Sequence, residues 1–152
     1  MKRTMFAAAL LALAARTLCA QTPAAPYAQH LVDTTLAAHP ELTVLALHVT
    51  PPNFPDNIII ASNIGRIGKP ADADDLAVLM SGKPRVESTK TGDMSVEVVM
   101  HDALGRPIGV IGSTFRAPVG ADRERLMRES QRVHDELAAG IPSLAALFGN
   151  AK

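Results

Sequence analysis

The chain has almost no cysteine, few aromatic residues and no excess of charge of either sign. Its 152 residues include one cysteine, one tyrosine and no tryptophan. The cysteine, Cys19, lies in an N-terminal segment that we expect to be removed, so the mature chain would have neither a disulfide nor a cysteine nucleophile. The 15 basic and 15 acidic residues balance, which gives no reason to expect nucleic acid or an anionic membrane as a partner.

The first 20 residues have the pattern of a secretory signal peptide. Lys2 and Arg3 precede an apolar run over residues 5–15 that is too short to span a bilayer, and Ala20 ends a small-residue cleavage site. We therefore expect cleavage near Ala20 and a periplasmic or secreted protein. Two alternatives stay open: an ordinary N-terminal helix, and a lipoprotein acylated at Cys19, whose cleavage motif the preceding residues fit poorly.

Cleavage would leave about 132 residues, enough for one domain with its own hydrophobic core. Three basic residues would leave with the leader, so the mature chain would carry 12 basic and 15 acidic residues. No later apolar run reaches membrane-spanning length. We expect a flexible lead-in over residues 21–27, a folded domain over residues 28–118 and a C-terminal helical segment over residues 119–152.

The spacing of apolar residues predicts helices in four parts of this region. Residues 28–39 repeat apolar side chains at helical spacing. Residues 71–80 begin with acidic side chains, which complement a helix dipole. Residues 122–139 predict a longer amphipathic helix, followed by a short segment at residues 144–148. The apolar stripe of the long helix consists of Leu126, Val133 and Leu137, with Met127 alongside.

Runs of β-branched and aliphatic residues predict five strands, at residues 42–50, 57–63, 85–90, 94–102 and 106–116. The turns that join the last three strands are too short for parallel crossovers, so these strands form antiparallel hairpins. The order of elements is helix, two strands, helix, three strands, helix. It predicts an α+β domain, with a five-stranded antiparallel sheet and N-terminal, connecting and C-terminal helices.

Two motifs in this order resemble those of single Cache domains, the PAS-like sensor folds found outside the bacterial inner membrane. One is "ASN-x-GRIGKP" at residues 61–70, and the other is "D-x-x-G-R-x-IG-V-IG-x-x-F" at residues 102–115. The resemblance extends over roughly residues 31–115. It implies a pocket between the sheet and the helix and loops that cover it. In this family the pocket typically binds a small molecule, often a carboxylate, an amino acid or another metabolite.

The resemblance also implies a role in sensing, because members are usually the extracytoplasmic parts of receptors. This chain differs from them in having no second membrane segment and no output domain. It also lacks the tryptophan that amino-acid-binding members use around an ammonium group. We therefore expect a soluble periplasmic module that binds a small metabolite and acts through a separate membrane receptor.

The polar residues that follow the second strand are the first candidates for ligand contact. Ser62, Asn63, Arg66 and Lys69 would place a hydroxyl, an amide and two cations at one rim of the implied pocket. Such a set suits a carboxylate or a phosphate, because a guanidinium binds planar oxygens in pairs. The alternative is that Asn63 only turns the chain and that the two cations face solvent.

Two histidines and a glutamate in the strands form a second candidate set for ligand contact. His48, Glu97 and His101 would be able to coordinate a metal, since imidazole and carboxylate are ordinary zinc ligands. However, no pair of them has a close ligand spacing, and a shared site depends on the strand register. We therefore keep the three residues as ligand-binding candidates and assign neither a metal nor a cofactor.

The sequence contains no set of residues that points to catalysis. No serine lies in a G-x-S-x-G context. Asp72, Asp74 and Asp75 lack the spacing and the glycine of a calcium loop, and we interpret them as the acidic first turn of a helix. We therefore predict a binding module and not an enzyme. The alternative is an interaction protein that uses the fold without a ligand, as a homodimer formed through the C-terminal helix.

Overall fold

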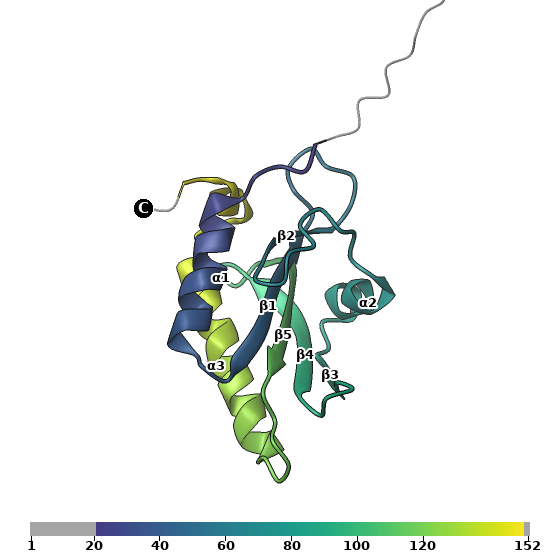
Figure 1. Ribbon diagram of the computed structural model, residues 1–152. Helices are drawn as coiled ribbons and strands as arrows, with labels where there is room; N and C mark the ends of the chain where they lie inside the picture. Colours follow the sequence, from purple (N-terminus) through teal and green to yellow (C-terminus); the bar gives the residue numbers. More distant parts are fainter. Residues whose placement is uncertain (1–20, 151–152) are drawn as a thin grey trace, which may run out of the picture.

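A computed structural model describes residues 21–150 of the chain (Figure 1). The fold is α+β: a five-stranded antiparallel sheet, in the order β2-β1-β5-β4-β3, carries helices on both faces. In chain order the elements are α1 (Pro26–Ala38), β1 (Leu42–Val49), β2 (Ile58–Ser62), α2 (Ala73–Ser81), β3 (Arg85–Ser88), β4 (Met94–His101), β5 (Pro107–Phe115), α3 (Arg123–Gly140) and the 3-10 helix η1 (Leu144–Phe148). The predicted fold class and order of elements are confirmed. The predicted signal peptide lies outside the described residues.

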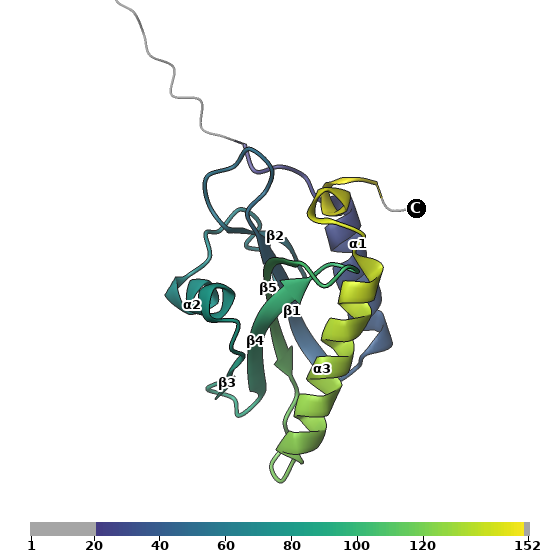
Figure 2. The same cartoon turned by 180° about the vertical axis from the view of Figure 1, so that it is seen from behind.

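The helices divide unequally between the two faces of the sheet. Helices α1 and α3 lie together on one face, and the short helix α2 lies alone on the other (Figures 1 and 2). The hydrophobic core fills the space under α1 and α3, with Phe115, Leu45, Leu47, Met94 and Ile111 fully buried from the sheet. The face under α2 is less crowded and more polar. Between residues 21 and 150, no helix has both the length and the apolar character needed to cross a membrane.

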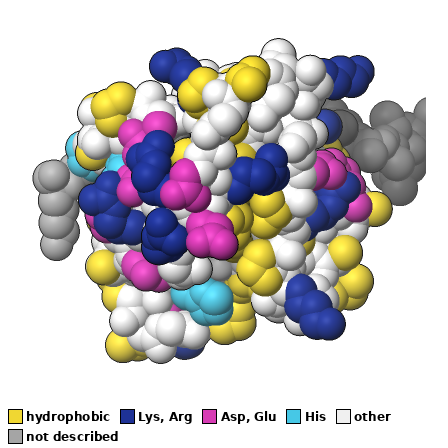
Figure 3. Space-filling view, turned by 90° about the horizontal axis from the view of Figure 1, so that it is seen from below, with side chains coloured by type: hydrophobic (Ala, Val, Ile, Leu, Met, Phe, Trp, Pro, Cys, Tyr) yellow, Lys and Arg dark blue, Asp and Glu magenta, His cyan; other side chains and the backbone are white. Residues whose placement is uncertain are grey.

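Helix α3 completes the core with its apolar stripe. Leu126, Val133 and Leu137 are at most 2% exposed and pack in the core. The stripe therefore faces the chain's own sheet and is not an exposed surface for a second copy. The opposite side of α3 is charged, and the view from below shows basic and acidic side chains intermixed on the side of the molecule where α1 and α3 lie (Figure 3).

Both ends of the described chain pack onto this domain. Helix α1 begins at Pro26, a residue that suits the first helical position because it has no N–H to lose. Ala25 is buried in the core. The Tyr27 hydroxyl donates to the Gly140 carbonyl at 2.6 Å, and the Tyr27 N–H donates to the Gly149 carbonyl at 3.0 Å. The residues just before α1 and the segment after α3 therefore pack against the rest of the described chain.

Helix α2 is fixed at both ends by its sequence. The Asp72 side chain accepts from the N–H groups of Asp74 and Asp75, and the Asp75 side chain accepts from the Asp72 N–H, which forms a capping box. Gly82 ends the helix in the left-handed conformation, which glycine adopts without steric cost. The interpretation of the acidic residues as the first turn of a helix is confirmed.

Candidate functional site

A polar pocket lies between the sheet and the segment that runs from β2 to α2. Its volume is about 260 Å³. The strands form the floor, with side chains from β1, β4 and β5, while residues 64–75 form the rim and one wall. The lining includes four of the seven residues that the sequence suggested for ligand contact: His48, Arg66, Lys69 and Glu97.

The strand register explains why the floor is open at its centre. Ala46 of β1, Gly112 of β5 and Glu97 of β4 are direct neighbours across three strands, so they share one face of the sheet. Gly112 has no side chain to fill the space above it. A Cβ atom added there would lie 3.8 Å from Nε2 of His48, which places the imidazole beside the open position. The pocket therefore depends on two small residues, Ala46 and Gly112, in the middle of the sheet.

His48 and Asp75 form a buried pair at one end of the pocket. Nδ1 of His48 lies 3.2 Å from Oδ2 of Asp75, and the two residues are 7% and 6% exposed. This contact does not form a hydrogen bond, so the buried Nδ1 has no hydrogen-bond partner. Burial opposes ionisation of Asp75, but contact with His48 and the Asp72 N–H together lower its pKa below the ordinary value. The same carboxylate thus caps α2 and faces the pocket histidine.

Glu97 is a second pocket residue with a polar atom that forms no hydrogen bond. Its Oε2 is buried without a hydrogen-bond partner, and the nearest cation is Nη1 of Arg85, 3.7 Å away. Burial first, and then the negative charge of Asp75, raise the pKa of Glu97, while Arg85 acts in the opposite direction. A buried carboxyl group without a partner costs stability, unless a ligand or water supplies one.

Two cations lie at the rim because the loop is paired to β2. The Ile59 N–H donates to the Lys69 carbonyl at 3.0 Å, and the Gly68 N–H donates to the Ile59 carbonyl at 2.8 Å. Arg66 adopts a left-handed conformation, with φ of 66°, which is uncommon for a residue with a side chain. Strained backbone of this kind often occurs at functional sites. Arg66 and Lys69 both remain exposed at the pocket rim.

Two of the other candidates, Ser62 and Asn63, have structural partners outside the pocket. The Asn63 side chain accepts from the Leu45 N–H and donates to the Thr43 carbonyl, both at 3.0 Å, so it continues the pairing of β1 beyond the end of β2. The Ser62 hydroxyl accepts from the Ile64 N–H at 3.1 Å and stabilises the turn. Neither residue lines the pocket. The positions of both residues are therefore explained by the local structure at the end of β2.

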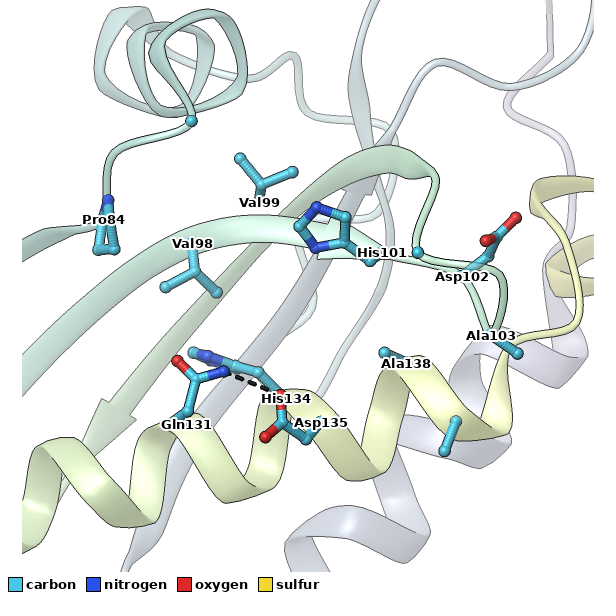
Figure 4. Close-up of a pocket in the computed structure, with 13 residues that line it drawn as sticks. Pro84, Val98, Val99, His101, Asp102, Ala103, Gln131, His134, Asp135 and Ala138 are labelled. Carbon is cyan, nitrogen blue, oxygen red and sulfur yellow. Dashed lines mark hydrogen bonds between the residues drawn. The ribbon is translucent and has the colours of Figure 1, made fainter.

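His101 lies apart from His48 and Glu97. It lies at the end of β4, four residues beyond Glu97, where the register of β4 and β5 shifts between Met100 and His101. Figure 4 shows His101 at the end of β4; it lines, together with His134 of α3, a separate cavity of about 490 Å³. The three strand residues considered as metal ligands are therefore not brought together as one set.

The glycine-arginine motif of the last hairpin has a structural explanation. The buried Asp102 carboxylate accepts from the N–H groups of Leu104 and Arg106, and from Nε of Arg106 at 2.7 Å. These bonds from Arg106 lower the pKa of Asp102. Gly105 takes the left-handed conformation that the turn requires. Asp102, Gly105 and Arg106 hold the β4–β5 turn and lie outside the candidate pocket, whereas Gly112 of the same motif lines it.

Sequence reasoning missed three parts of the pocket: Asp72, Asp75 and Gly112. The aspartates were interpreted as the start of a helix, which is correct but incomplete, since that helix start faces His48. Gly112 belongs to an apolar run, and only its position between Ala46 and Glu97 shows its role. No known family model matches this chain, and no curated protein matches it either.

Proposed function

We propose that the protein is an exported binding module of the Cache class, which holds a small polar metabolite and acts through a separate membrane partner. The observation that carries the proposal is the polar pocket on the α2 face of the PAS-like sheet, where the buried Oε2 of Glu97 lacks a hydrogen-bond partner and Nε2 of His48 borders the open position above Gly112. Its place between the sheet and the covering helix and loop is the place that the resemblance to Cache domains implies for a ligand.

The charges around the pocket favour a small carboxylate that also carries a hydrogen-bond donor. Arg66 and Lys69 at the rim suit the carboxylate, because guanidinium and ammonium groups donate hydrogen bonds to carboxylate oxygens. Glu97 and His48 would accept N–H or O–H groups from the inner part of the ligand. A volume of about 260 Å³ is below the range of about 300–1,000 Å³ typical for drug-sized ligands. We therefore expect a compact metabolite.

Thermal denaturation with a panel of metabolites tests this proposal. The panel contains small carboxylates, amines, nucleobases and haem. A ligand at 100 times its dissociation constant stabilises a protein by about 2.7 kcal/mol, which corresponds to roughly 10 °C in a domain of this size. In the double variant Arg66→Gln with Lys69→Gln, a carboxylate ligand should no longer raise the melting temperature. Lys83→Gln, at another exposed lysine, serves as the matched control. If no compound raises the melting temperature at millimolar concentration, the proposal is wrong.

The alternative of an interaction protein without a ligand needs a different surface from the one first considered. The stripe of Leu126, Val133 and Leu137 is buried in the chain's own core. A homodimer through α3 would have to use its charged side, where ion pairs between exposed residues contribute little. Light scattering of the wild-type chain distinguishes the two proposals, since a monomer that responds to a metabolite supports the binding module.

A further inference from the structure

A buried histidine faces carboxylates on the side of the sheet opposite the proposed ligand pocket. His39, which follows the last residue of α1, is 4% exposed. Its Nδ1 lies 3.1 Å from Oε1 of Glu129, and its Nε2 lies 2.8 Å from Oε2 of Glu136. Both glutamates belong to α3. Each ring nitrogen of one imidazole therefore meets a carboxylate oxygen.

A third carboxylate lies at the same place. Ligand atoms of His39, Glu41 and Glu129 all lie within 4.8 Å of one another. Arg132 also pairs with Glu129; this contact, aided by Glu41 and His39 and opposed by burial, lowers the pKa of Glu129 to about 2. Three carboxyl side chains, those of Glu41, Glu129 and Glu136, thus lie around one imidazole, and Arg132 is a basic partner of Glu129.

We propose that His39, Glu41 and Glu129 bind a divalent transition-metal cation of the Zn²⁺ type. Two ligands of tetrahedral zinc, with bonds of about 2.0–2.1 Å, are about 3.3 Å apart. The separation of 3.1 Å between Nδ1 of His39 and Oε1 of Glu129 is close to this value. The mixed set of one imidazole and two carboxylates suits zinc and its neighbours in the first transition row.

The contact of His39 with Glu136 supports this assignment. A histidine that binds a metal through one ring nitrogen almost always donates its other N–H to a carboxylate, a carbonyl or water. Here Nε2 is 2.8 Å from Oε2 of Glu136. That bond would fix the tautomer with a proton on Nε2, which leaves the lone pair of Nδ1 directed at the metal position between His39, Glu41 and Glu129.

Backbone hydrogen bonds hold two of the three ligands, His39 and Glu41, before any metal arrives. The His39 N–H donates to the Thr35 carbonyl, and the His39 carbonyl accepts from the Leu42 N–H, both at 3.0 Å. The Arg116 N–H donates to the Glu41 carbonyl at 2.8 Å. Metal binding would require only that Arg132 leave Oε1 of Glu129. The Arg132 side chain is 59% exposed, so this movement takes place at the surface.

Titration with metal ions tests the proposal on the full chain, purified without an affinity tag and treated with a chelator. The background carries Cys19→Ser, because a free thiol would compete for the metal. Isothermal titration with ZnCl₂ should give one saturable site with a dissociation constant in the micromolar range or below. CoCl₂ should produce the visible absorption of four-coordinate cobalt, and Zn²⁺ should abolish it. Ion pairs alone would produce neither signal.

Substitutions locate the site. Glu41→Gln, Glu129→Gln and His39→Gln should each weaken Zn²⁺ binding by at least about tenfold, and Glu136→Gln should weaken it by about 10–100-fold. The matched controls, His30→Gln and Glu87→Gln, alter exposed residues elsewhere and should leave the affinity unchanged. If His39→Gln does not fold, the three glutamate variants still decide the question. Absence of saturable binding up to millimolar Zn²⁺, or binding that survives all of the cluster substitutions, would overturn the proposal.

Discussion

Replacing His134 with leucine should remove part of the protein's sensitivity to acid. His134 lies on α3, is 6% exposed and has a buried Nε2 without a hydrogen-bond partner. Burial lowers its pKa from the ordinary value of 6.5 to about 4, and the charge of Asp135 opposes this shift. The folded protein therefore keeps this imidazole neutral at a pH where the unfolded chain protonates it.

The direction of the effect follows from the two protonation states. The unfolded chain takes up the proton near pH 6.5, while the folded chain takes it up only near pH 4. The contribution to stability is therefore fully present above pH 6.5 and is lost as the pH falls through 4. For one group with these two pKa values, the loss is about 2 kcal/mol at pH 5 and about 3 kcal/mol at pH 4.

Urea denaturation at pH 7 and pH 5 measures this loss. The carboxylates also lose stabilising interactions in acid, so the informative quantity is the difference between variants. His134→Leu should lose about 2 kcal/mol less than the wild type between these two pH values. His30→Leu, at an exposed histidine of α1, should behave like the wild type.

Two results would contradict the reasoning. The first is an equal loss of stability in the wild type and in His134→Leu. The second is an NMR titration in which the His134 imidazole gains its proton near pH 6.5. The NMR measurement is needed because His101, Asp102 and Asp135 line the same cavity (Figure 4). It assigns the titration to one side chain.

Three further substitutions test the fold and the pocket. Leu126→Ala should lower the free energy of unfolding by about 2–5 kcal/mol in urea denaturation, because Leu126 is fully buried. The control Leu104→Ala, at a residue that is 74% exposed, should change this free energy by no more than about 0.5 kcal/mol. Asp72→Ala should lower the free energy of unfolding by about 1 kcal/mol, because the capping box of α2 is lost. If Asp56→Ala, at an exposed aspartate, lowers the free energy of unfolding by the same amount, Asp72 does not stabilise the helix in this way. Gly112→Ala should fold and bind a carboxylate ligand normally, because the added Cβ atom has space. Gly112→Leu should fill the pocket and raise the dissociation constant of a carboxylate ligand, measured by calorimetry, at least about tenfold, which is equivalent to about 1.4 kcal/mol. An unchanged dissociation constant would place the ligand elsewhere.

The order of elements could be predicted from the sequence because the signals are local. The alternation of apolar residues and the short turns at Gly92 and Gly105 fix the hairpins, and the left-handed conformation of both glycines shows why these turns suit them. The acidic first turn of α2 is equally local, since Asp72 and Asp75 satisfy each other's N–H groups. These features depend on residues close together in the chain.

The composition of the pocket could be predicted only in part, because it depends on register. Between Leu47 and His48, β2 holds one residue more than β1 opposes, and between Met100 and His101, β5 holds one residue more than β4 opposes. The first irregularity has no marker such as a proline in the strand, whereas Pro107, the partner of His101, lies at the second. Asn63 is similar: its side chain finds the backbone of β1, 18 and 20 residues away, and only the folded chain brings them together.

The two faces of the sheet contribute differently to the stability of the folded chain. The apolar core lies under α1 and α3, where Phe115, Leu126 and Leu137 are almost completely buried. Because the hydrophobic core lies on this face, the face under α2 can contain buried polar groups such as Glu97, whose Oε2 lacks a hydrogen-bond partner. Such groups cost stability in the free protein, and a ligand that pairs with them removes this cost on binding. The polar pocket is therefore a place where the stability of the fold and the affinity for a ligand are linked: replacing Glu97 by an apolar residue of similar size should stabilise the free protein and weaken the complex.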